Sequence, residues 1–303
     1  MNPPITLNAV TKHYGRTQSL RGLTLSVEGG ELFGLVGVNG AGKTTTLSLV
    51  LGFIQATSGS LSVLGLDPWK DAAQLHKSIA WLPGDVRLPG GLTGKDWLAY
   101  QADAGGLKRE RFTALAQEWE VPLDRPMRTL SKGNRQKVAL LRLLASEAPL
   151  LVLDEPTSGL DPVAQERLLT ELRARGRAGT TVLFSSHSLS EVQALCDRMA
   201  VIDAGRVLRV GSVGELTAGG EQTLQVWTRD ELPKALFGRW RAEKLEGRWM
   251  LHGDRLLEEA IPQLAAYGVE RLEFGGQGLE GLLAALHDPN AAPTGRRGEG
   301  VHA

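Results

Sequence analysis

Residues 37–44 read GVNGAGKT and fit the phosphate-binding pattern G-x-x-x-x-G-K-[ST]. The glycines of such a loop let the backbone wrap closely, so that its N–H groups point at phosphate oxygens. Lys43 places a cation beside the β- and γ-phosphates, where it also assists catalysis, and Thr44 offers its hydroxyl to Mg²⁺. The chain has 37 glycines, so a chance match is the alternative, but the flanking apolar and helical stretches argue against it. The predicted nucleotide contacts are Gly37, Asn39, Gly40, Ala41, Gly42, Lys43, Thr44 and Thr45.

Two adjacent carboxylates end an apolar run further along the chain, in LLVLDEP. Asp154 comes at the end of a buried strand, which is where an open α/β sheet places its ligand groups, and its carboxylate can hold Mg²⁺ through water. Glu155 follows and can orient or deprotonate an attacking water. A solvated strand end is the alternative, and the phosphate-binding loop in the same chain makes the catalytic interpretation the better one.

One histidine ends another apolar run, in VLFSSH. A lone histidine more often has a structural role than a catalytic one. This strand end is expected at the same edge of the sheet as Asp154, because parallel strands end on one side. We therefore expect His187 to contact the γ-phosphate or the catalytic water.

A second helix start also suits an anion, in LSKGNRQKVALLRLL. Ser131, Gly133 and Asn134 present hydroxyl and backbone N–H groups at the positive end of that helix. The alternative is an ordinary capped amphipathic helix with Ser131 near its start. The two interpretations are compatible, but a cap alone does not explain a second anion-binding helix start.

Apolar runs alternate with helical patterns up to about residue 208, which predicts an α/β domain with a mostly parallel central sheet. The runs at 31–38, 149–154 and 180–186 are nearly continuous and predict strands buried on both faces. The two segments at 5–10 and 23–28 alternate with period two and predict an antiparallel N-terminal part. Residues 85–145 hold helical patterns without strand-like runs, which predicts an inserted helical lobe.

A polar stretch with two glycines, LTAGGEQ, predicts a linker between domains. We assign residues 1–217 to the first domain and 222–287 to a small α+β domain of β-α-β-β-α-β, ferredoxin-like order. Its elements are expected at 223–228, 231–240, 242–253 (a hairpin), 254–268, 269–274 and 279–288. The tail 288–303 is rich in Pro, Gly and Arg and is expected to be disordered.

Composition excludes several classes of protein. The chain has 303 residues, with 34 basic and 34 acidic ones, so it lacks the cation surplus of a protein that coats nucleic acid. Its one cysteine, Cys196, permits no internal disulfide, which favours a reducing compartment. No apolar stretch approaches the ~20 residues of a membrane span, and the first residues show no secretion signal.

The ordered set GVNGAGKT, LSKGN, LLVLDEPTSGLD and SSH resembles the ATPase subunit of ABC transporters, over roughly residues 5–215. The resemblance implies the P-loop NTPase fold of ABC ATPases, with ATP and Mg²⁺ as ligands. It also implies that Tyr14 stacks on adenine, that Asp161 belongs to a loop signalling between subunits, and that His187 is a switch histidine.

In this family two ATPase subunits face each other head to tail, and the signature helix of one covers the γ-phosphate held by the other. The resemblance thus implies a homodimer in which Ser131 and Gly133 contact ATP on the second copy. Lys132 and Asn134 depart from the usual Gly and Gln of that motif. Where family members have a glutamine that contacts Mg²⁺, this chain has Gly84, so either Asp85 or a water is expected to take the role.

The LP loop followed by LTG, the SKGN variant and the short C-terminal unit resemble ATPases of ABC-2-type systems, including antibiotic and drug exporters. That implies a separate membrane permease as partner, no direct nucleic-acid contact, no membrane span of its own and a place at the cytoplasmic face of the plasma membrane. Two other interpretations stay open: an ABC-type ATPase that acts on nucleic acid or ribosomes, and a module that holds ATP without turnover. The neutral charge opposes the first, and an intact set of catalytic groups opposes the second.

Overall fold

The structure is a computed structural model, and it describes residues 2–217, 222–233, 240–245, 247–253, 256–275, 279, 282–283 and 286. The chain divides into two compact units, Met1–Val213 and Gly214–Ala303. Each unit has its own sheet system and its own apolar core.

The first unit is organised around a six-stranded sheet of order β5-β6-β7-β3-β8-β9. Adjacent strands are parallel from β5 to β8, and only β9 runs antiparallel to its neighbour β8. This confirms the predicted, mostly parallel α/β sheet. The strands are β3 (Leu32–Val36), β5 (Ile79–Leu82), β6 (Leu150–Asp154), β7 (Thr181–Ser186), β8 (Arg198–Asp203) and β9 (Arg206–Ser212).

The central strands are apolar throughout because helices cover both faces of the sheet. Every residue of β3, β6 and β7 is buried. On one face, Leu35 of β3 belongs to the same buried cluster as Leu47 of helix α1 (Lys43–Val50). On the other face, Gly34 lies against Val192 of helix α7 (Leu189–Leu195).

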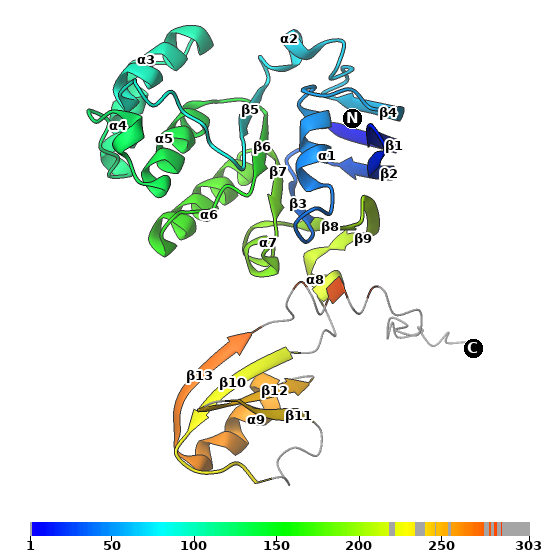
Figure 1. The fold of residues 1–303 in the computed structure, drawn as a ribbon, viewed down its shortest axis with the longest axis vertical. Coiled ribbons are helices and arrows are strands. Elements are labelled where there is room, and N and C mark those ends of the chain that lie inside the picture. The colour runs from blue at the N-terminus through cyan, green and yellow to red at the C-terminus, as the bar shows by residue number, and fades with distance from the viewer. Residues whose placement is uncertain are drawn as a thin grey trace, which may run out of the picture. The chain divides into compact units, whose positions relative to one another are not determined.

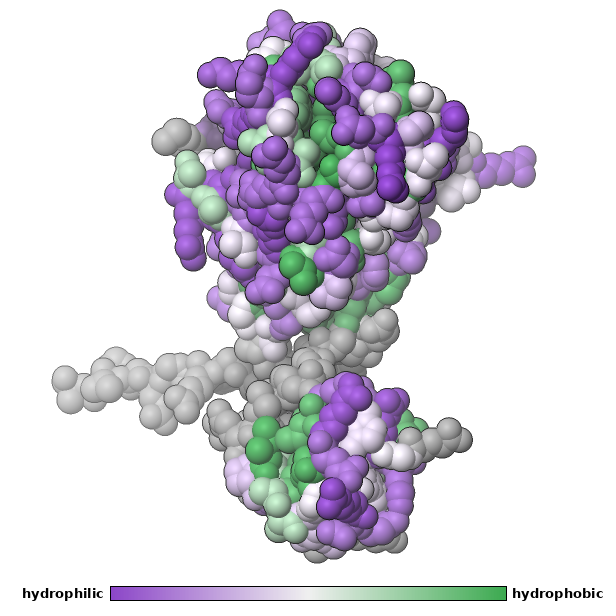
Figure 2. All heavy atoms as spheres, turned by 90° about the vertical axis from the view of Figure 1, so that its left-hand side faces the viewer, coloured by the Kyte–Doolittle hydropathy of each residue, from purple (hydrophilic) through white to green (hydrophobic). Residues whose placement is uncertain are grey.

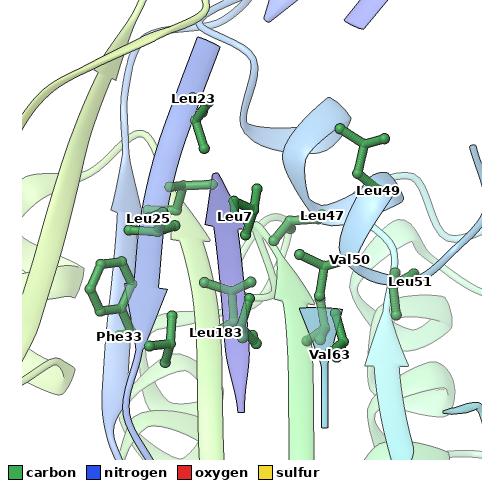
Figure 3. Close-up of a cluster of buried hydrophobic side chains, with 14 of the residues drawn as sticks. Leu7, Leu23, Leu25, Phe33, Leu47, Leu49, Val50, Leu51, Val63 and Leu183 are labelled. Atoms are coloured by element: carbon green, nitrogen blue, oxygen red, sulfur yellow. The ribbon is translucent and has the colours of Figure 1, made fainter. Parts of the chain in front are cut away.

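A second, three-stranded antiparallel sheet of order β2-β1-β4 packs over α1. Its strands are β1 (Ile5–Tyr14), β2 (Thr17–Val27) and β4 (Ser58–Val63). Leu7 pairs with Leu25 on one side and with Leu61 on the other, so the alternating apolar residues of β1 and β2 face the core together. Figure 3 shows the resulting cluster, in which leucines of this sheet and of α1 meet Phe33 and Leu183 of the large sheet.

The predicted helical lobe is present and is inserted between β5 and β6 (Figure 1). Thr93 caps its first helix, accepting a hydrogen bond from Asp96 N at 3.1 Å. Figure 2 shows the face that bears this lobe, where hydrophilic side chains predominate around smaller apolar areas. The lobe contains α3 (Gly94–Gly105), α4 (Arg109–Glu118), the 3₁₀ turn η1 (Met127–Thr129) and α5 (Lys132–Ala145).

The other helices of this unit connect strands of the large sheet. Helix α6 (Pro162–Arg177) has an aspartate cap and proline in its first turn, both typical of helix starts. Helix α2 (Ala72–Leu75) is a single turn before β5, and α8 (Val213–Thr217) begins where the unit ends. In the described part of the chain, no helix has both the length and the apolar character that crossing a membrane requires.

The second unit has a four-stranded antiparallel sheet of order β11-β12-β10-β13, with α9 packed on it. This order agrees with the expected ferredoxin-like unit, in which the first strand lies between the third and the fourth. The helices expected at 231–240 and 279–288 and the tail at 288–303 lie largely or wholly outside the described residues. The elements are β10 (Gln222–Thr228), β11 (Arg241–Leu245), β12 (Arg248–Gly253), α9 (Leu256–Leu264), the 3₁₀ turn η3 (Ala265–Tyr267) and β13 (Val269–Gly275).

Gly34→Ala tests the contact between β3 and α7. A Cβ at this position would lie 2.5 Å from Val192 Cγ1 and 3.2 Å from Cys196 Sγ, so the helix must shift to admit it. We expect a loss of about 1–3 kcal/mol in the free energy of unfolding, measured by urea denaturation. Gly91→Ala is the matched control, because its Cβ would meet nothing within 4 Å. Equal midpoints for the two variants would contradict this packing.

Candidate active site

The phosphate-binding loop connects β3 to α1, as its sequence context predicts. Gly42 precedes the helix with φ of 110°, a conformation that suits glycine alone, and a Cβ there would lie 2.7 Å from Leu20 Cδ2. At Gly37 a Cβ would lie 2.4 Å from the carbonyl oxygen of Ile202. Gly40 has φ of 84°, which also favours glycine, although a Cβ there would face open space. All three glycines are therefore required, either by the backbone conformation or by neighbouring atoms.

Lys43 is the first residue of α1, and its side chain is only 5% exposed. Its Nζ donates to the carbonyl oxygens of Gly37 at 2.7 Å and Val38 at 3.3 Å, and lies 3.3 Å from Glu155 Oε1. The ammonium group is thus held at the loop by three oxygens. A buried cation in this position attracts an anion strongly, because little water screens it.

Asp154 ends β6 and is buried, and both of its carboxylate oxygens are engaged by hydroxyl groups. Thr44 Oγ1 donates to Oδ2 at 2.8 Å, and Ser185 Oγ, from the neighbouring strand β7, donates to Oδ1 at 2.5 Å. A hydroxyl and a carboxylate side by side are oxygen ligands of the kind that Mg²⁺ takes. Within the described residues, no group of three or more His, Cys, Asp or Glu side chains could hold a metal by itself.

Glu155 occupies the left-handed region with φ of 42°, which is uncommon for a residue other than glycine. Its backbone N–H is held by Ser185, through the carbonyl oxygen at 3.2 Å and Oγ at 3.1 Å. The carboxylate then lies between Lys43 and His187, whose Nδ1 is 3.1 Å from Glu155 Oε2. Strained backbone that neighbouring contacts hold in place is typical of catalytic positions.

His187 follows β7 directly, and its side chain is 58% exposed. The strand ends of β6 and β7 therefore bring Asp154, Glu155 and His187 to one edge of the sheet, beside the phosphate-binding loop. This is the juxtaposition that the sequence predicts. It gives the site a cation, a carboxylate 3.3 Å from that cation, and an imidazole within hydrogen-bonding reach of the carboxylate.

The second helix start lies on a different part of the unit. Ser131 caps α5, accepting from Asn134 N at 3.2 Å, so the capping interpretation is correct. Gly133 is in close contact with the following loop, since a Cβ there would lie 2.7 Å from the carbonyl oxygen of Gly159. Across the described residues of this unit, no hydrogen bond or ion pair joins residues 131–134 to residues 37–45. The two helix starts are thus not bonded to each other within one chain.

Asp161 links the same loop to two helices. Its Oδ1 caps α6, accepting from Ala164 N at 2.8 Å, and its Oδ2 lies 3.0 Å from Lys137 Nζ of α5. The hydrogen bond from the Ala164 N–H, followed by that from Lys137, lowers the pKa of Asp161 below its ordinary value. Gln136 adds a buried bond from Nε2 to the carbonyl oxygen of Pro156 at 3.1 Å. The start of α5 therefore holds the loop 155–161 near both of its ends, at Pro156 and at Asp161.

The remaining predicted residues lie around this centre. Tyr14, at the end of β1, is half-exposed, and Lys12 Nζ lies 5.1 Å from the centroid of its ring. Thr45 Oγ1 shares a hydrogen bond with Ser19 Oγ at 2.8 Å. Asn39 is exposed in the loop, and Ala41 is buried beneath it.

Gly84, which stands where the resemblance to ABC ATPases leads one to expect a glutamine, is adjacent to Asp154. A Cβ at Gly84 would lie 3.4 Å from the Asp154 carboxylate, in ordinary contact with it. A cavity of about 410 Å³, lined in part by Thr44, Asp154 and Glu155, opens in front of this glycine. Asp85 lines the same cavity, but its exposed carboxylate pairs with Arg87 at 2.7 Å. Its role as a metal ligand stays a prediction.

Sequence reasoning missed Ser185, which bonds both to Asp154 and to the Glu155 backbone. It also missed Gln136, which holds the 155–161 loop to α5. A small polar residue at the carboxyl end of a buried strand was the available signal for Ser185. Gln136 gave no such signal, because its partner is a backbone carbonyl twenty residues away.

The comparisons with known proteins agree with this architecture. The sequence profile of the family described as ABC transporter matches residues 20–158. The chain is 32% identical to "Uncharacterized ABC transporter ATP-binding protein YhaQ" of Bacillus subtilis, covering 75% of this chain and 78% of that one. It is 31% identical to "Linearmycin resistance ATP-binding protein LnrL" of the same organism, covering 72% of each. It is 34% identical to "Nod factor export ATP-binding protein I" of Ralstonia nicotianae, covering 71% and 68%.

Two solved structures are similar to about 70% of this chain. One, titled "Structure of ATP binding subunit of ABC transporter", has a TM-score of 0.64 at 29% identity and covers 70% of this chain and 91% of its own. Another, a dimeric ATP-binding cassette bound to ADP and Pi, has a TM-score of 0.63 at 23% identity and covers 69% and 98%, which supports the fold. Fold and site together define an ABC-type ATPase cassette. The chain belongs to the ATP-binding proteins of ABC transporters.

Proposed function

We propose that this chain binds ATP with Mg²⁺, hydrolyses it to ADP and phosphate, and thereby drives export of a substrate through a separate membrane permease. The observation that carries the proposal is the arrangement at Glu155, whose carboxylate lies 3.3 Å from Lys43 of the phosphate-binding loop and 3.1 Å from His187. A base, a cation for the phosphate and an imidazole thus meet at one point. A module that only held ATP would not require this arrangement.

The chain's own groups divide the work of hydrolysis. Backbone N–H groups of the loop and the Lys43 ammonium hold and neutralise the phosphates. Thr44 and Asp154 would hold Mg²⁺, which when bound stabilises charge on the phosphate oxygens. Glu155 accepts a proton from the attacking water, and His187 orients that water or the γ-phosphate. Tyr14 stacks on the adenine ring.

The second helix start supports a dimer in which each ATP is bound by both chains. Ser131 and Lys132 are exposed at the start of α5, and that helix end carries partial positive charge. Because these residues have no bond to the chain's own phosphate-binding loop, Ser131, Gly133 and Asn134 are free to cover the γ-phosphate of a second copy. Asp161, bonded to Lys137 of α5, then ties this interface to the loop that begins at Glu155.

Export is favoured by the relatives, which include a linearmycin-resistance and a Nod-factor-export ATP-binding protein. With a permease as partner, the chain would act at the cytoplasmic face of the plasma membrane. The proposed partnership with a permease is tested by co-expressing the chain with the membrane protein encoded by the neighbouring reading frame. Stimulation of ATP hydrolysis in the co-purified complex is the expected result. Failure of the two proteins to associate, with ATP hydrolysis intact, would remove the export role and leave the ATPase.

Lys43→Ala tests the nucleotide site. Removing the ammonium group leaves the phosphates without their charged partner, and we expect ATP affinity to fall about 10- to 100-fold. Isothermal titration calorimetry measures this directly. Lys70→Ala is the control, because Lys70 is exposed and its one ion pair among the described residues is with Asp67. Unchanged affinity in Lys43→Ala would contradict the assignment of the loop.

A further inference from the structure

A second cavity of the first unit has no part in the chemistry above. It measures about 450 Å³ and lies between the core of the unit and the helical lobe. Its lining includes His76 and Lys77 after α2, the start of β5, and Arg142 with Ser146 at the end of α5. Figure 1 shows β5 beside the lobe that contains α3 and α5.

This cavity is distinct from the nucleotide site. Ile79 and Pro149, which line it, lie at the starts of the parallel strands β5 and β6, whereas Asp154 is the last residue of β6. Pro149 and Asp154 are five residues apart along the strand. At a rise of about 3.3 Å per residue, roughly 16 Å separates them. No residue lines both this cavity and the one beside the phosphate-binding loop.

Arg142 is the unusual group here. It lies in the last turn of α5, and its Nε donates to Gln101 Oε1 at 2.7 Å. Among the described residues, no carboxylate pairs with this guanidinium and no further hydrogen bond satisfies its terminal amino groups. Burial alone lowers the pKa of Arg142, with no compensating charge. The terminal amino groups are not among the buried unpartnered atoms of the described residues, so they are open to solvent at the cavity. An anion there would form charge-assisted hydrogen bonds with a partly buried guanidinium that has no counter-charge.

Lys77 supplies a second cation at the same cavity. It too forms no ion pair within the part of the chain that the structure describes. The one carboxylate in the lining, Glu147, is already paired with Arg111 at 2.7 Å. His76 Nε2 is bonded to the carbonyl oxygen of Leu51 at 2.7 Å, which leaves Nδ1 for other contacts. The balance of charge in the cavity is therefore positive.

We propose that this cavity binds a phosphate group through Arg142 and Lys77, and so bridges the helical lobe and the core of the unit. A phosphate dianion matches two cations, whereas a single carboxylate balances only one. The planar guanidinium presents a fork of donors that suits phosphate oxygens. The volume exceeds that of a bare phosphate ion, so the group is carried by a larger molecule, either a free phosphomonoester or a lipid headgroup.

The binding test uses the Lys43→Ala chain, so that the phosphate-binding loop does not retain the probe. Inorganic phosphate, glycerol 3-phosphate and vesicles containing phosphatidic acid are titrated at constant ionic strength, with calorimetry for the soluble probes and sedimentation for the vesicles. We expect saturable binding of inorganic phosphate that weakens about tenfold or more on adding Arg142→Gln or Lys77→Gln. Adding Lys70→Gln, which removes an equal charge outside the cavity, should change nothing.

Tighter binding of glycerol 3-phosphate than of inorganic phosphate would identify a free phosphomonoester, and vesicle binding that requires Arg142 would identify a headgroup. Either result supports the site. Absence of binding by all three probes, or equal binding in the Arg142→Gln chain, would overturn it, and neither result bears on ATP hydrolysis.

A stability measurement tests separately whether Arg142 lacks a compensating negative charge in the folded chain. Without anion, Arg142→Gln should keep or raise the urea midpoint, because it removes an uncompensated charge. Arg175→Gln is the comparison, since Arg175 is also largely buried but pairs with Glu171 at 3.0 Å and donates to Ser146 O at 2.9 Å. That substitution should lower the midpoint. An equal loss in both variants would show that Arg142 is an ordinary structural arginine and would contradict the proposal.

Discussion

Glu155→Gln should slow ATP hydrolysis by about 10²- to 10⁴-fold, because the amide cannot accept the proton that the attacking water gives up. The substitution keeps the size of the side chain, and the left-handed backbone at this position is held by Ser185 rather than by the carboxylate. Folding and ATP binding are therefore expected to stay intact. Phosphate release under saturating ATP measures the loss of turnover.

The same variant should accumulate as an ATP-bound dimer. If ATP is the link between two chains and cannot be split, the link persists, and light scattering should report twice the mass of one chain with ATP and a single chain without it. Glu166→Gln is the control, since Glu166 is exposed on α6. Turnover in Glu155→Gln equal to that of the control would remove Glu155 as the base. A single-chain mass with ATP bound would argue against the closed dimer.

Much of the candidate active site could be predicted from the sequence, because its residues lie either in one contiguous motif or at the ends of strands. The loop 37–44 is one contiguous motif, and its glycines are where the backbone requires them. Asp154 and His187 each follow an apolar run, and parallel strands bring such positions to the same edge of a sheet without knowledge of the strand order. Buried parallel strands are also the easiest to identify, since their apolar runs are continuous.

Contacts that depend on packing between distant segments could not be obtained this way. Ser185 bonds to Asp154 and Glu155 only because β7 is the neighbour of β6, and the alternation of apolar residues does not specify neighbours. The close approach of Gly133 to Gly159 is likewise a consequence of how α5 meets the loop before α6. The uncompensated Arg142 is a third case, since its position in an amphipathic helix resembles that of any exposed arginine.

The backbone at one proposed catalytic residue departs from the conformation that its residue type prefers. Glu155 has a positive φ that its residue type disfavours, and it is the proposed base. Gly84 lies beside Asp154 and lines the cavity there, where a Cβ would be in ordinary contact with the carboxylate. A departure from local preference, such as the positive φ of Glu155, is expected where function competes with stability.

The sharing of each ATP between two chains can be tested by mixing two inactive variants. Lys43→Ala disables the phosphate-binding loop, and Ser131→Arg replaces the hydroxyl at the start of α5 with a bulky side chain that cannot cover the γ-phosphate, so that each substitution disables one side of a shared site. Ser131 is exposed, so the substitution costs little more than the loss of a helix cap. Each variant alone is expected to show almost no turnover.

A mixed dimer of these two chains has one intact site, made from the loop of the Ser131→Arg chain and the α5 start of the Lys43→Ala chain. Random mixing of equal amounts should restore about a quarter of the wild-type turnover, because half of the dimers are mixed and each has one of two sites. If both anion-binding helix starts acted on ATP within one chain, mixing would restore nothing, since every chain would still carry a defect. A mixture of Lys43→Ala with Glu155→Gln is the negative control, because both lesions then lie on the loop side and neither site is whole. Recovery in the first mixture and its absence in the second would place Ser131 opposite Lys43 across the interface.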